Sequence, residues 1–208
     1  MFNMRHDNVL KQISKFMTEV VSAKQKSSNT EQTPTNGTYI TFCKPGQNIP
    51  HGELPQRKGL SDGFLSGSHD WQLLSDLDER LVFPHFIAPT TCRPDIVLFS
   101  KKLRRVLWLE LTVCSEDRII QSREKKLSRY RHLKQECVKN GWEVEALTAE
   151  VGARGAISSS LDGLARALGC CKEKQRQIRR NCRNAALNSS YVIWLRRREK
   201  AWRDWPLF

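Results

Sequence analysis

Two acidic residues, Asp95 and Glu110, lie in sequence that is otherwise suited to burial. Asp95 opens an apolar run, and Glu110 falls inside a second one, residues 106–113. A buried carboxylate without a partner or a metal ion destabilises a fold by several kcal/mol, so compensation is expected. Two carboxylates that converge on one point form a site for a divalent cation, and such a cation can assist hydrolysis of a phosphodiester.

The two acids are predicted to lie on a pair of strands joined by a short basic turn, SKKLRR. Residues 95–99 are apolar on both faces after the aspartate, which is typical of a strand inside a sheet. Residues 106–113 alternate, and the alternation gives one wholly apolar face and one mixed face. The apolar face carries Leu107, Leu109, Leu111 and Val113, and the mixed face carries Val106, Trp108, Glu110 and Thr112.

These residues resemble a known motif. Pro94-Asp95, a strand turn and Glu110-x-Thr112 resemble the PD-(D/E)xK nuclease motif, with threonine in place of the usual lysine. The segments DWQLLSDL, VFPHFIAPTTCRPDIVLFS, ELTV, EKKLSRY and GWEVEALTAEVGARG follow in this order and spacing. They resemble the restriction-like endonuclease segments at the C-terminal ends of site-specific non-LTR retroelement polyproteins, and related stand-alone eukaryotic open reading frames. The opening MRHDNVLKQI is similar to the segment after the zinc knuckle of such polyproteins, so the matches touch most of residues 4–165.

The resemblance implies an α/β fold with a restriction-endonuclease-like αβββαβ core. It also implies an endonuclease that depends on Mg²⁺ or Mn²⁺ and nicks a DNA target for insertion of the element. Asp95 and Glu110 would hold the metal, with the Leu111 carbonyl as a third ligand. The zinc knuckle is absent, which leaves open that the chain is a fragment and that upstream reverse transcriptase and zinc-knuckle regions are its partners.

Thr112 stands where the family has its lysine, and threonine carries no charge to stabilise a transition state. A helix predicted downstream offers Lys126 beside its apolar stripe, four residues before Tyr130. Lys126 is either the migrated catalytic lysine or a rim lysine whose stem covers apolar surface. Tyr130 is either a supporting residue or a core tyrosine with a satisfied hydroxyl. Asp76 lies where some relatives supply a further acid, although a single acid on a helix is usually only solvated.

The charge balance predicts a polyanionic partner, with nucleic acid first and an anionic membrane surface second, and duplex DNA is the nucleic acid expected. The net charge is +13 and the isoelectric point is near 9.7. Gly152 and Gly155 permit a phosphate to approach the backbone near Arg154, and a plain turn explains them equally. The candidate nucleic-acid contacts are Lys101, Lys102, Arg104, Arg105, Lys125, Arg129, Arg154, Arg179, Arg180 and Arg183.

Periodicity divides the chain into three regions. Residues 1–37 hold an amphipathic helix over residues 5–24, packed on the domain or on an upstream partner, and a polar linker. Residues 38–168 form the core, with a strand over 38–43, a loop over 44–68, helices over 70–81, 115–139 and 158–168, and further strands over 82–87 and 142–151. Residues 169–208 form a basic helical tail, whose arginines and tryptophans either contact DNA or dock on the core.

Other features of the sequence bear on the cellular location of the protein and on its class of function. No run approaches the roughly 20 apolar residues of a membrane span, and no secretory signal is visible. Seven cysteines without a CxxC pair predict reduced thiols and an intracellular, nuclear protein. Two other classes remain: a non-catalytic nucleic-acid-binding module that kept the fold and lost the lysine, and a basic scaffold or membrane-surface protein that needs neither acid.

Overall fold

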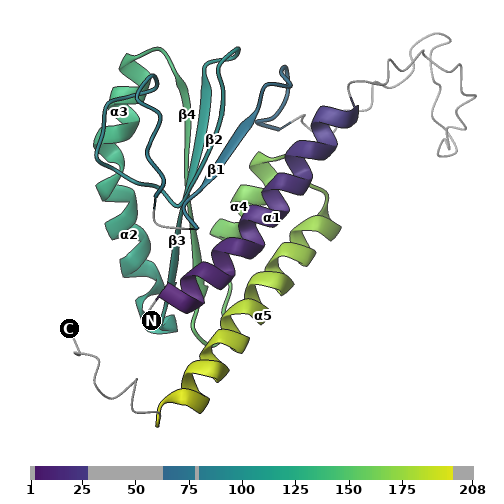
Figure 1. The fold of residues 1–208 in the computed structure, drawn as a ribbon, viewed down its shortest axis with the longest axis vertical. Helices are drawn as coiled ribbons and strands as arrows, with labels where there is room; N and C mark the ends of the chain where they lie inside the picture. The colour runs from purple at the N-terminus through teal and green to yellow at the C-terminus, as the bar shows by residue number, and fades with distance from the viewer. Residues whose placement is uncertain (1–2, 28–62, 78–79, 199–208) are drawn as a thin grey trace, which may run out of the picture.

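The computed structural model describes residues 3–27, 63–77 and 80–198. Its helices and strands follow one another as α1 (Asn3–Ser27), β1 (Gln72–Ser75), β2 (Ile96–Ser100), β3 (Arg105–Cys114), the 3₁₀ helix η1 (Glu116–Arg118), α2 (Ile119–Arg129), α3 (Arg131–Lys139), β4 (Glu143–Gly152), α4 (Ser160–Ala167) and α5 (Lys172–Arg196). Figure 1 shows the sheet between two groups of helices. Within these residues no helix is both long and apolar enough to cross a membrane.

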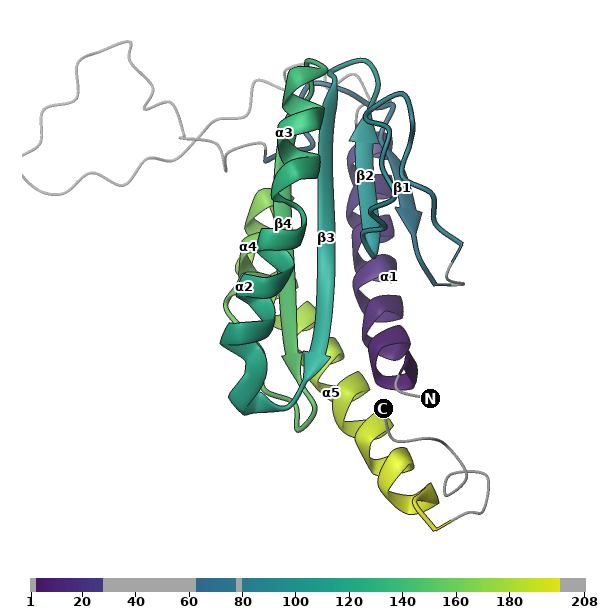
Figure 2. The same ribbon diagram turned by 90° about the vertical axis from the view of Figure 1, so that its left-hand side faces the viewer.

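The strands form one mixed sheet in the order β1-β2-β3-β4. β1 pairs with β2 and β2 with β3 in antiparallel fashion, because only short connections separate β2 from β3. β3 and β4 are parallel, since the chain crosses back through α2 and α3 before β4 begins (Figure 2). The predicted pair of strands and the later strand are therefore confirmed.

Each face of the sheet has its own apolar core. One face carries Leu107, Leu109 and Leu111 of β3, and it packs against α1, α4 and α5. The other face carries Val106 and Trp108, and it packs against Tyr130, Leu133 and Cys137 at the junction of α2 and α3. The alternation read from the sequence of residues 106–113 is thus confirmed, and it places Glu110 on the side of α2.

The N-terminal helix packs on the domain itself. Its predicted apolar stripe is buried and consists of Val9, Leu10, Ile13, Phe16, Met17, Val20 and Val21. This stripe joins the core beneath β3, which also includes Ile178, Cys182 and Ala186 of α5, and α1 lies along α5 (Figure 1). The element order therefore begins with α1 as the first helix, followed by three strands, the α2–α3 pair and β4.

The basic C-terminal region also belongs to the packed body. α5 buries Ile178, Cys182, Ala186 and Ser189. The Asn8 side chain on α1 donates to the Ser189 hydroxyl at 2.9 Å. Residues 199–208, which include two of the tail tryptophans, lie outside the described residues.

The helix predicted over residues 70–81 is wrong. Residues 72–75 form β1, and Leu73 and Leu74 point to opposite faces of the sheet, opposite Leu98 and Val97. Spacings of three and four residues between apolar side chains suit a helix, but backbone pairing with the buried β2 satisfies more polar groups than a short isolated helix can. Pairing with β2, which is distant in sequence, therefore makes residues 72–75 a strand and not a helix.

Asp70 has a different role from the one that a helix start would give it. Its side chain accepts hydrogen bonds from the Ser100 hydroxyl at 2.5 Å and from the Lys102 amide at 2.9 Å. The Ser68 hydroxyl also donates to Asp70. Asp70 therefore holds the turn between β2 and β3.

The strand predicted over residues 82–87 is also wrong. Pro84 has no N–H to offer a sheet, and its carbonyl instead accepts from Ile87 at 2.9 Å in a turn. Phe83 and Ile87 are buried against the α2–α3 side of the sheet. The strand over 38–43, most of the loop over 44–68 and most of the linker lie outside the described residues.

The long helix predicted over residues 115–139 is interrupted. It consists of η1, α2 and α3, with a break at Tyr130 whose amide donates to the Lys126 carbonyl. Its end is confirmed at Gly141, which has a φ of 76° that glycine adopts without strain. The helix predicted over residues 158–168 is confirmed as α4.

Candidate active site

Asp95 lies at the mouth of β2 and is tied to β3 through its side chain. Its Oδ2 accepts a hydrogen bond from the Leu111 amide at 2.6 Å. The last strand pair is Ile96 with Leu109, so the same register places Leu111 opposite Pro94. Proline has no N–H, so Pro94 cannot donate a backbone hydrogen bond to the Leu111 carbonyl. The Leu111 amide is bonded by the Asp95 carboxylate in place of a backbone carbonyl of the neighbouring strand. The N–H and C=O of a strand residue share one edge, so the Leu111 carbonyl faces the same side as Asp95.

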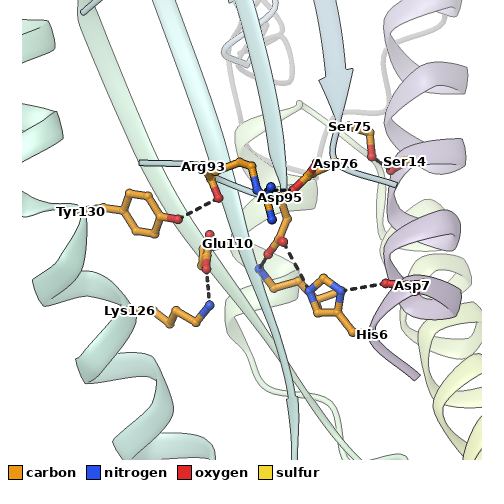
Figure 3. Close-up of polar contacts among 11 residues, drawn as sticks. His6, Asp7, Ser14, Ser75, Asp76, Arg93, Asp95, Glu110, Lys126 and Tyr130 are labelled. Carbon is orange, nitrogen blue, oxygen red and sulfur yellow. Dashed lines mark hydrogen bonds and ion pairs between the residues drawn. The ribbon is translucent and has the colours of Figure 1, made fainter. Parts of the chain in front are cut away.

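Glu110 is the buried carboxylate that the sequence predicts. It is 3% exposed, and its Oε1 contacts the Nζ of Lys126. Its Oε2 is buried and has no hydrogen-bond partner among the described residues. Burial raises the pKa of Glu110, and the negative charge of Asp95 raises it further, while Lys126 lowers it. The arrangement is drawn in Figure 3.

The Lys126 side chain extends from α2 to the Glu110 carboxylate. The side chain of Lys126 is 29% exposed, whereas Lys125 is fully on the surface. α2 contains no buried residue, so this helix covers the sheet loosely and its lysine can extend towards β3. The contact places the ammonium group of Lys126 on the face of β3 that carries Glu110 and Thr112. Thr112 itself contributes only a hydroxyl to that face.

Tyr130 is both a core residue and a support for the site. It is buried beside Trp108, with ring centroids 6.4 Å apart. Its hydroxyl donates to the Arg93 carbonyl at 3.1 Å, two residues before Asp95. Burial raises the pKa of Tyr130, as does the charge of Glu110. Tyr130 therefore fixes the backbone that leads into Pro94-Asp95.

Asp76 holds the same backbone from the other side. Its Oδ2 pairs with the Arg93 guanidinium at 2.8 Å, and its Oδ1 accepts from the Leu81 amide at 2.8 Å. Its own amide donates to the Asp95 carbonyl at 2.8 Å. Both carboxylate oxygens are thus engaged away from Glu110, and Asp76 positions the strand mouth instead of joining the pair of acids.

Two residues of the site region were missed by reasoning from the sequence. Glu150 on β4 lies opposite Thr112 and is fully buried; its Oε2 accepts from the Ser160 hydroxyl at 2.5 Å, and its Oε1 has no partner in the described chain. The available signal was weaker than for Glu110: Glu150 lies between the apolar residues Ala149 and Val151, but the same strand also carries Glu143 and Glu145. The second is His6 on α1, whose Nε2 lies 3.4 Å from the Oδ1 of Asp95.

A cavity of about 250 Å³ lies beside the site, between β3, β4 and the helices. Its polar lining comes from Glu110, Lys126, Tyr130, Arg131, Lys134 and Thr148. Arg131 and Lys134 are exposed, so the mouth of the cavity is basic while its floor holds the buried carboxylate.

The predicted nucleic-acid contacts lie in several places. Lys125 and Arg129 are exposed on α2, next to Lys126. The turn with Lys101, Lys102, Arg104 and Arg105 lies at the start of β3, about 17 Å from Glu110 at the usual rise of a strand. The structure therefore brings only the α2 contacts close to the paired acids.

The remaining predicted contacts are mostly engaged within the fold. Arg154 pairs with Glu116 at 3.1 Å, and Glu116 also accepts from the Arg154 amide at 2.7 Å. Glu116 thus occupies the position near Gly152 that was considered for a phosphate. Arg179 pairs with Asp162 at 2.7 Å, and Arg183 donates to the Gly155 carbonyl at 3.2 Å, while Arg180 is exposed on α5.

The donors near Asp95 suit a hard divalent cation. Asp95 and Glu110 are carboxylates, Leu111 offers a carbonyl on the same edge, and the orphan Oε2 of Glu110 is a buried atom that a cation would satisfy. As the side chains lie, the described chain has no group of three or more His, Cys, Asp or Glu residues arranged to hold a metal ion. No protein-family model, curated protein or solved structure matches this chain.

Proposed function

We propose that this protein is a metal-dependent endonuclease that hydrolyses phosphodiester bonds in DNA and nicks a target for retroelement insertion in the nucleus. The observation that carries the proposal is the contact between Lys126 and the buried Glu110, beside an Asp95 that is tied to Leu111. A carboxylate pair suits the ligand preference of Mg²⁺, and a neighbouring lysine suits the stabilisation of negative charge that develops during hydrolysis.

The order of the elements supports the proposal. A helix, three strands, a helical crossover and a fourth strand correspond to the αβββαβ core that the resemblance to PD-(D/E)xK nucleases implies. The mixed sheet has its antiparallel part at β1, β2 and β3 and its parallel pair at β3 and β4. In this arrangement the two acids come from adjacent strands, as the motif requires.

The chain's own residues divide the chemical tasks. Asp95, Glu110 and the Leu111 carbonyl would hold Mg²⁺ or Mn²⁺, which supplies charge to polarise the scissile phosphate and to lower the pKa of a water molecule. Lys126 places a positive charge beside these acids, where negative charge develops during cleavage. Tyr130 and Asp76 hold the backbone at Arg93, and so keep Asp95 in place.

The surface around the site suits a phosphate backbone. Arg131 and Lys134 are exposed at the mouth of the cavity, and Lys125 and Arg129 are exposed on the same helical segment, α2. Such side chains bind DNA by neutralising phosphates, without regard to sequence.

The test is cleavage of supercoiled plasmid with Mg²⁺ or Mn²⁺. Wild-type protein should convert the plasmid to the nicked form, and Asp95→Ala should not, although both bind the DNA. Glu124→Ala, which removes an exposed acid from α2, is the matched control and should cleave normally. Equal cleavage by wild type and Asp95→Ala would refute the proposal.

A second function is favoured by one observation. Thr112 replaces the motif lysine. Among the described residues, Lys126 is the lysine that contacts these acids, and its ammonium forms an ion pair with Glu110. A protein that binds DNA through its basic surface and does not cleave it is the corresponding alternative. Salt-dependent binding without nicking under any divalent ion would establish it.

A further inference from the structure

The last turns of α5 expose a strip of large side chains, which consists of Leu187, Tyr191, Trp194 and Arg197 and is called the α5 strip below. Leu187 is 41% exposed, Tyr191 is 61% exposed and Trp194 is 55% exposed. These three residues are four and three positions apart, so they lie along one face of the helix. Figure 2 shows that this end of α5 projects beyond the ends of β3 and β4. A contiguous exposed apolar patch is typical of an interaction site.

The two aromatic rings of the strip are arranged to stack. Tyr191 and Trp194 are nearly parallel, with 14° between the ring planes and 6.2 Å between the ring centroids. The Arg197 guanidinium lies over the Trp194 ring, 4.0 Å from its centroid, and its Nη1 donates to the Trp194 carbonyl at 2.5 Å. Exposed aromatic faces with an arginine beside them are the groups on which proteins bind the bases of single-stranded nucleic acids.

The charge along α5 complements a polyanion. Residues 174–198 contain eight lysines and arginines and no aspartate or glutamate. Arg197 and Arg198 are exposed at the strip, and Arg183 is exposed one turn before Leu187, where it donates to the Gly155 carbonyl. A partner that fits this surface is anionic and also offers flat apolar faces. A single strand of nucleic acid has both, because its phosphates are charged and its bases are unpaired.

The fold holds the strip in place. The Ser190 hydroxyl donates to the Ala153 carbonyl at 2.6 Å, and the Ala153 amide donates to the Cys114 carbonyl at 2.7 Å. The turn after β4 and the end of β3 therefore support α5 beside the strip. α5 and α2 pack on opposite faces of the sheet (Figure 1), so the strip is separate from the basic surface of α2.

We propose that the α5 strip binds single-stranded nucleic acid, with bases stacked on Tyr191 and Trp194 and a phosphate beside Arg197. This activity goes beyond the proposed cleavage of DNA, because it uses neither the paired acids nor a metal ion. Duplex DNA does not fit the strip, since its bases are stacked on one another and present only their edges in the grooves.

An anionic membrane surface is the other partner that a basic helix with tryptophan can have. The strip suits a membrane less well, because the Arg197 guanidinium lies on the Trp194 ring and would enter the apolar layer with it. In addition, α5 buries Ile178, Cys182 and Ala186 inside the protein, so only the narrow strip is left for a bilayer.

The test is fluorescence anisotropy of labelled oligonucleotides with the full chain, in the presence of a chelator so that no metal-dependent cleavage occurs. Wild type should bind an oligothymidylate at least about fivefold more tightly than the matching abasic oligonucleotide, which has the same phosphates and no bases. Tyr191→Ala and Trp194→Ala should each weaken binding of the oligothymidylate by about 5- to 100-fold. Both variants should bind the abasic strand and a blunt duplex as wild type does.

The control variants separate stacking from general apolar contact and from charge. Tyr191→Phe and Trp194→Phe keep an aromatic ring and should retain the affinity. Leu195→Ala truncates an apolar side chain that is 52% exposed next to the strip, and it should also retain the affinity. Arg197→Gln should weaken binding of both oligonucleotides and reduce the slope of log affinity against log salt by about 0.7. Since these side chains are exposed, the thermal unfolding midpoints should match that of wild type.

Three results would overturn the proposal. The first is equal affinity of wild type for the oligothymidylate and the abasic strand, and the second is a loss at Leu195→Ala as large as at Tyr191→Ala. The third is binding to phosphatidylserine vesicles that Trp194→Ala abolishes without weakening the oligothymidylate complex, which would assign the strip to a membrane. If the expected binding is found and no plasmid is nicked, the proposed function fails and this inference stands.

Discussion

The Nζ of Lys126 on α2 contacts the Oε1 of Glu110 on β3, a residue 16 positions earlier in the chain. The two partners differ in their surroundings, because Glu110 is almost fully buried and Lys126 is not. The charge of the lysine can therefore be satisfied by solvent, and the charge of the glutamate cannot. This asymmetry makes the consequences of losing each partner different.

Removing Lys126 should abolish most of the cleavage. Loss of one transition-state donor typically reduces the rate by about a hundredfold or more. Lys126→Ala should show this loss with Mn²⁺ affinity intact, whereas Lys125→Ala, one residue earlier and on the surface, should reduce only DNA binding. Single-turnover nicking of plasmid measures the cleavage rate of the two variants. Thr112→Lys in the Lys126→Ala background should recover activity. Equal, small effects at the two lysines would contradict the role of Lys126.

The two partners should also have opposite effects on stability without metal. Lys126→Ala leaves a buried carboxylate without its cation and should lower the free energy of unfolding by about 1–3 kcal/mol at pH 7. Glu110→Gln removes the buried charge and leaves a lysine that solvent can reach, so it should be neutral or stabilising. Thermal unfolding in the presence of a chelator measures both. A loss at Glu110→Gln as large as at Lys126→Ala would show that the pair is a net stabilising bridge.

Asp70 should make the stability depend on pH in a narrow acidic range. Burial raises the pKa of Asp70, but hydrogen bonds from Ser100, from Ser68 and from the Lys102 amide together outweigh burial and lower the pKa to about 2, from an ordinary value of 3.8. A lowered folded-state pKa contributes stability above pH 3.8, and the contribution is lost as the pH falls towards 2. Asp70→Asn should therefore be less stable than wild type at pH 6, and the gap should close on acidification. A gap that persists at pH 2 would exclude ionisation as its cause.

The salt dependence of DNA binding should report the α2 surface. Each phosphate contact that is removed should reduce the slope of log affinity against log salt by about 0.9. Lys125→Gln combined with Arg129→Gln should therefore flatten the slope, while Arg180→Gln on α5 should not. Point substitutions are used because deleting residues 169–208 would remove α5, expose the side of α1 that it covers and unfold the protein. A flatter slope for Arg180→Gln alone would move the DNA surface to α5.

Replacement of Gly63, in the loop before β1, and of Gly163, in α4, by alanine should have opposite effects on stability. A Cβ on Gly63 would lie 2.6 Å from the Gly169 amide nitrogen, at a φ of 59° that other residues rarely adopt. Gly63→Ala should therefore destabilise the fold strongly. Gly163 lies inside α4 with no atom within 4 Å of its Cβ position, so Gly163→Ala should stabilise by about 0.5–1 kcal/mol. Denaturant titration of both variants measures the difference.

The sequence predicted best where local pattern and burial agree. The alternation around Trp108 and Glu110 identified β3 and its buried acid, because both faces of that strand meet a core. The pattern failed at Leu73 and Leu74, where pairing with β2 outweighs helical spacing in a segment too short to form a helix alone. It could not reveal the contact of His6 with Asp95, since nothing local in α1 records where that helix docks on the sheet.

The packing of α1 on α5 has a consequence for synthesis on the ribosome. Residues 28–171 lie between these two helices, so at about 5–20 residues per second roughly seven to thirty seconds pass before synthesis of α5 begins. During that time the buried flank of α1 lacks its cover, and the helix that carries His6 cannot dock stably on the sheet. The nascent chain should therefore acquire a complete candidate site only after α5 has left the exit tunnel.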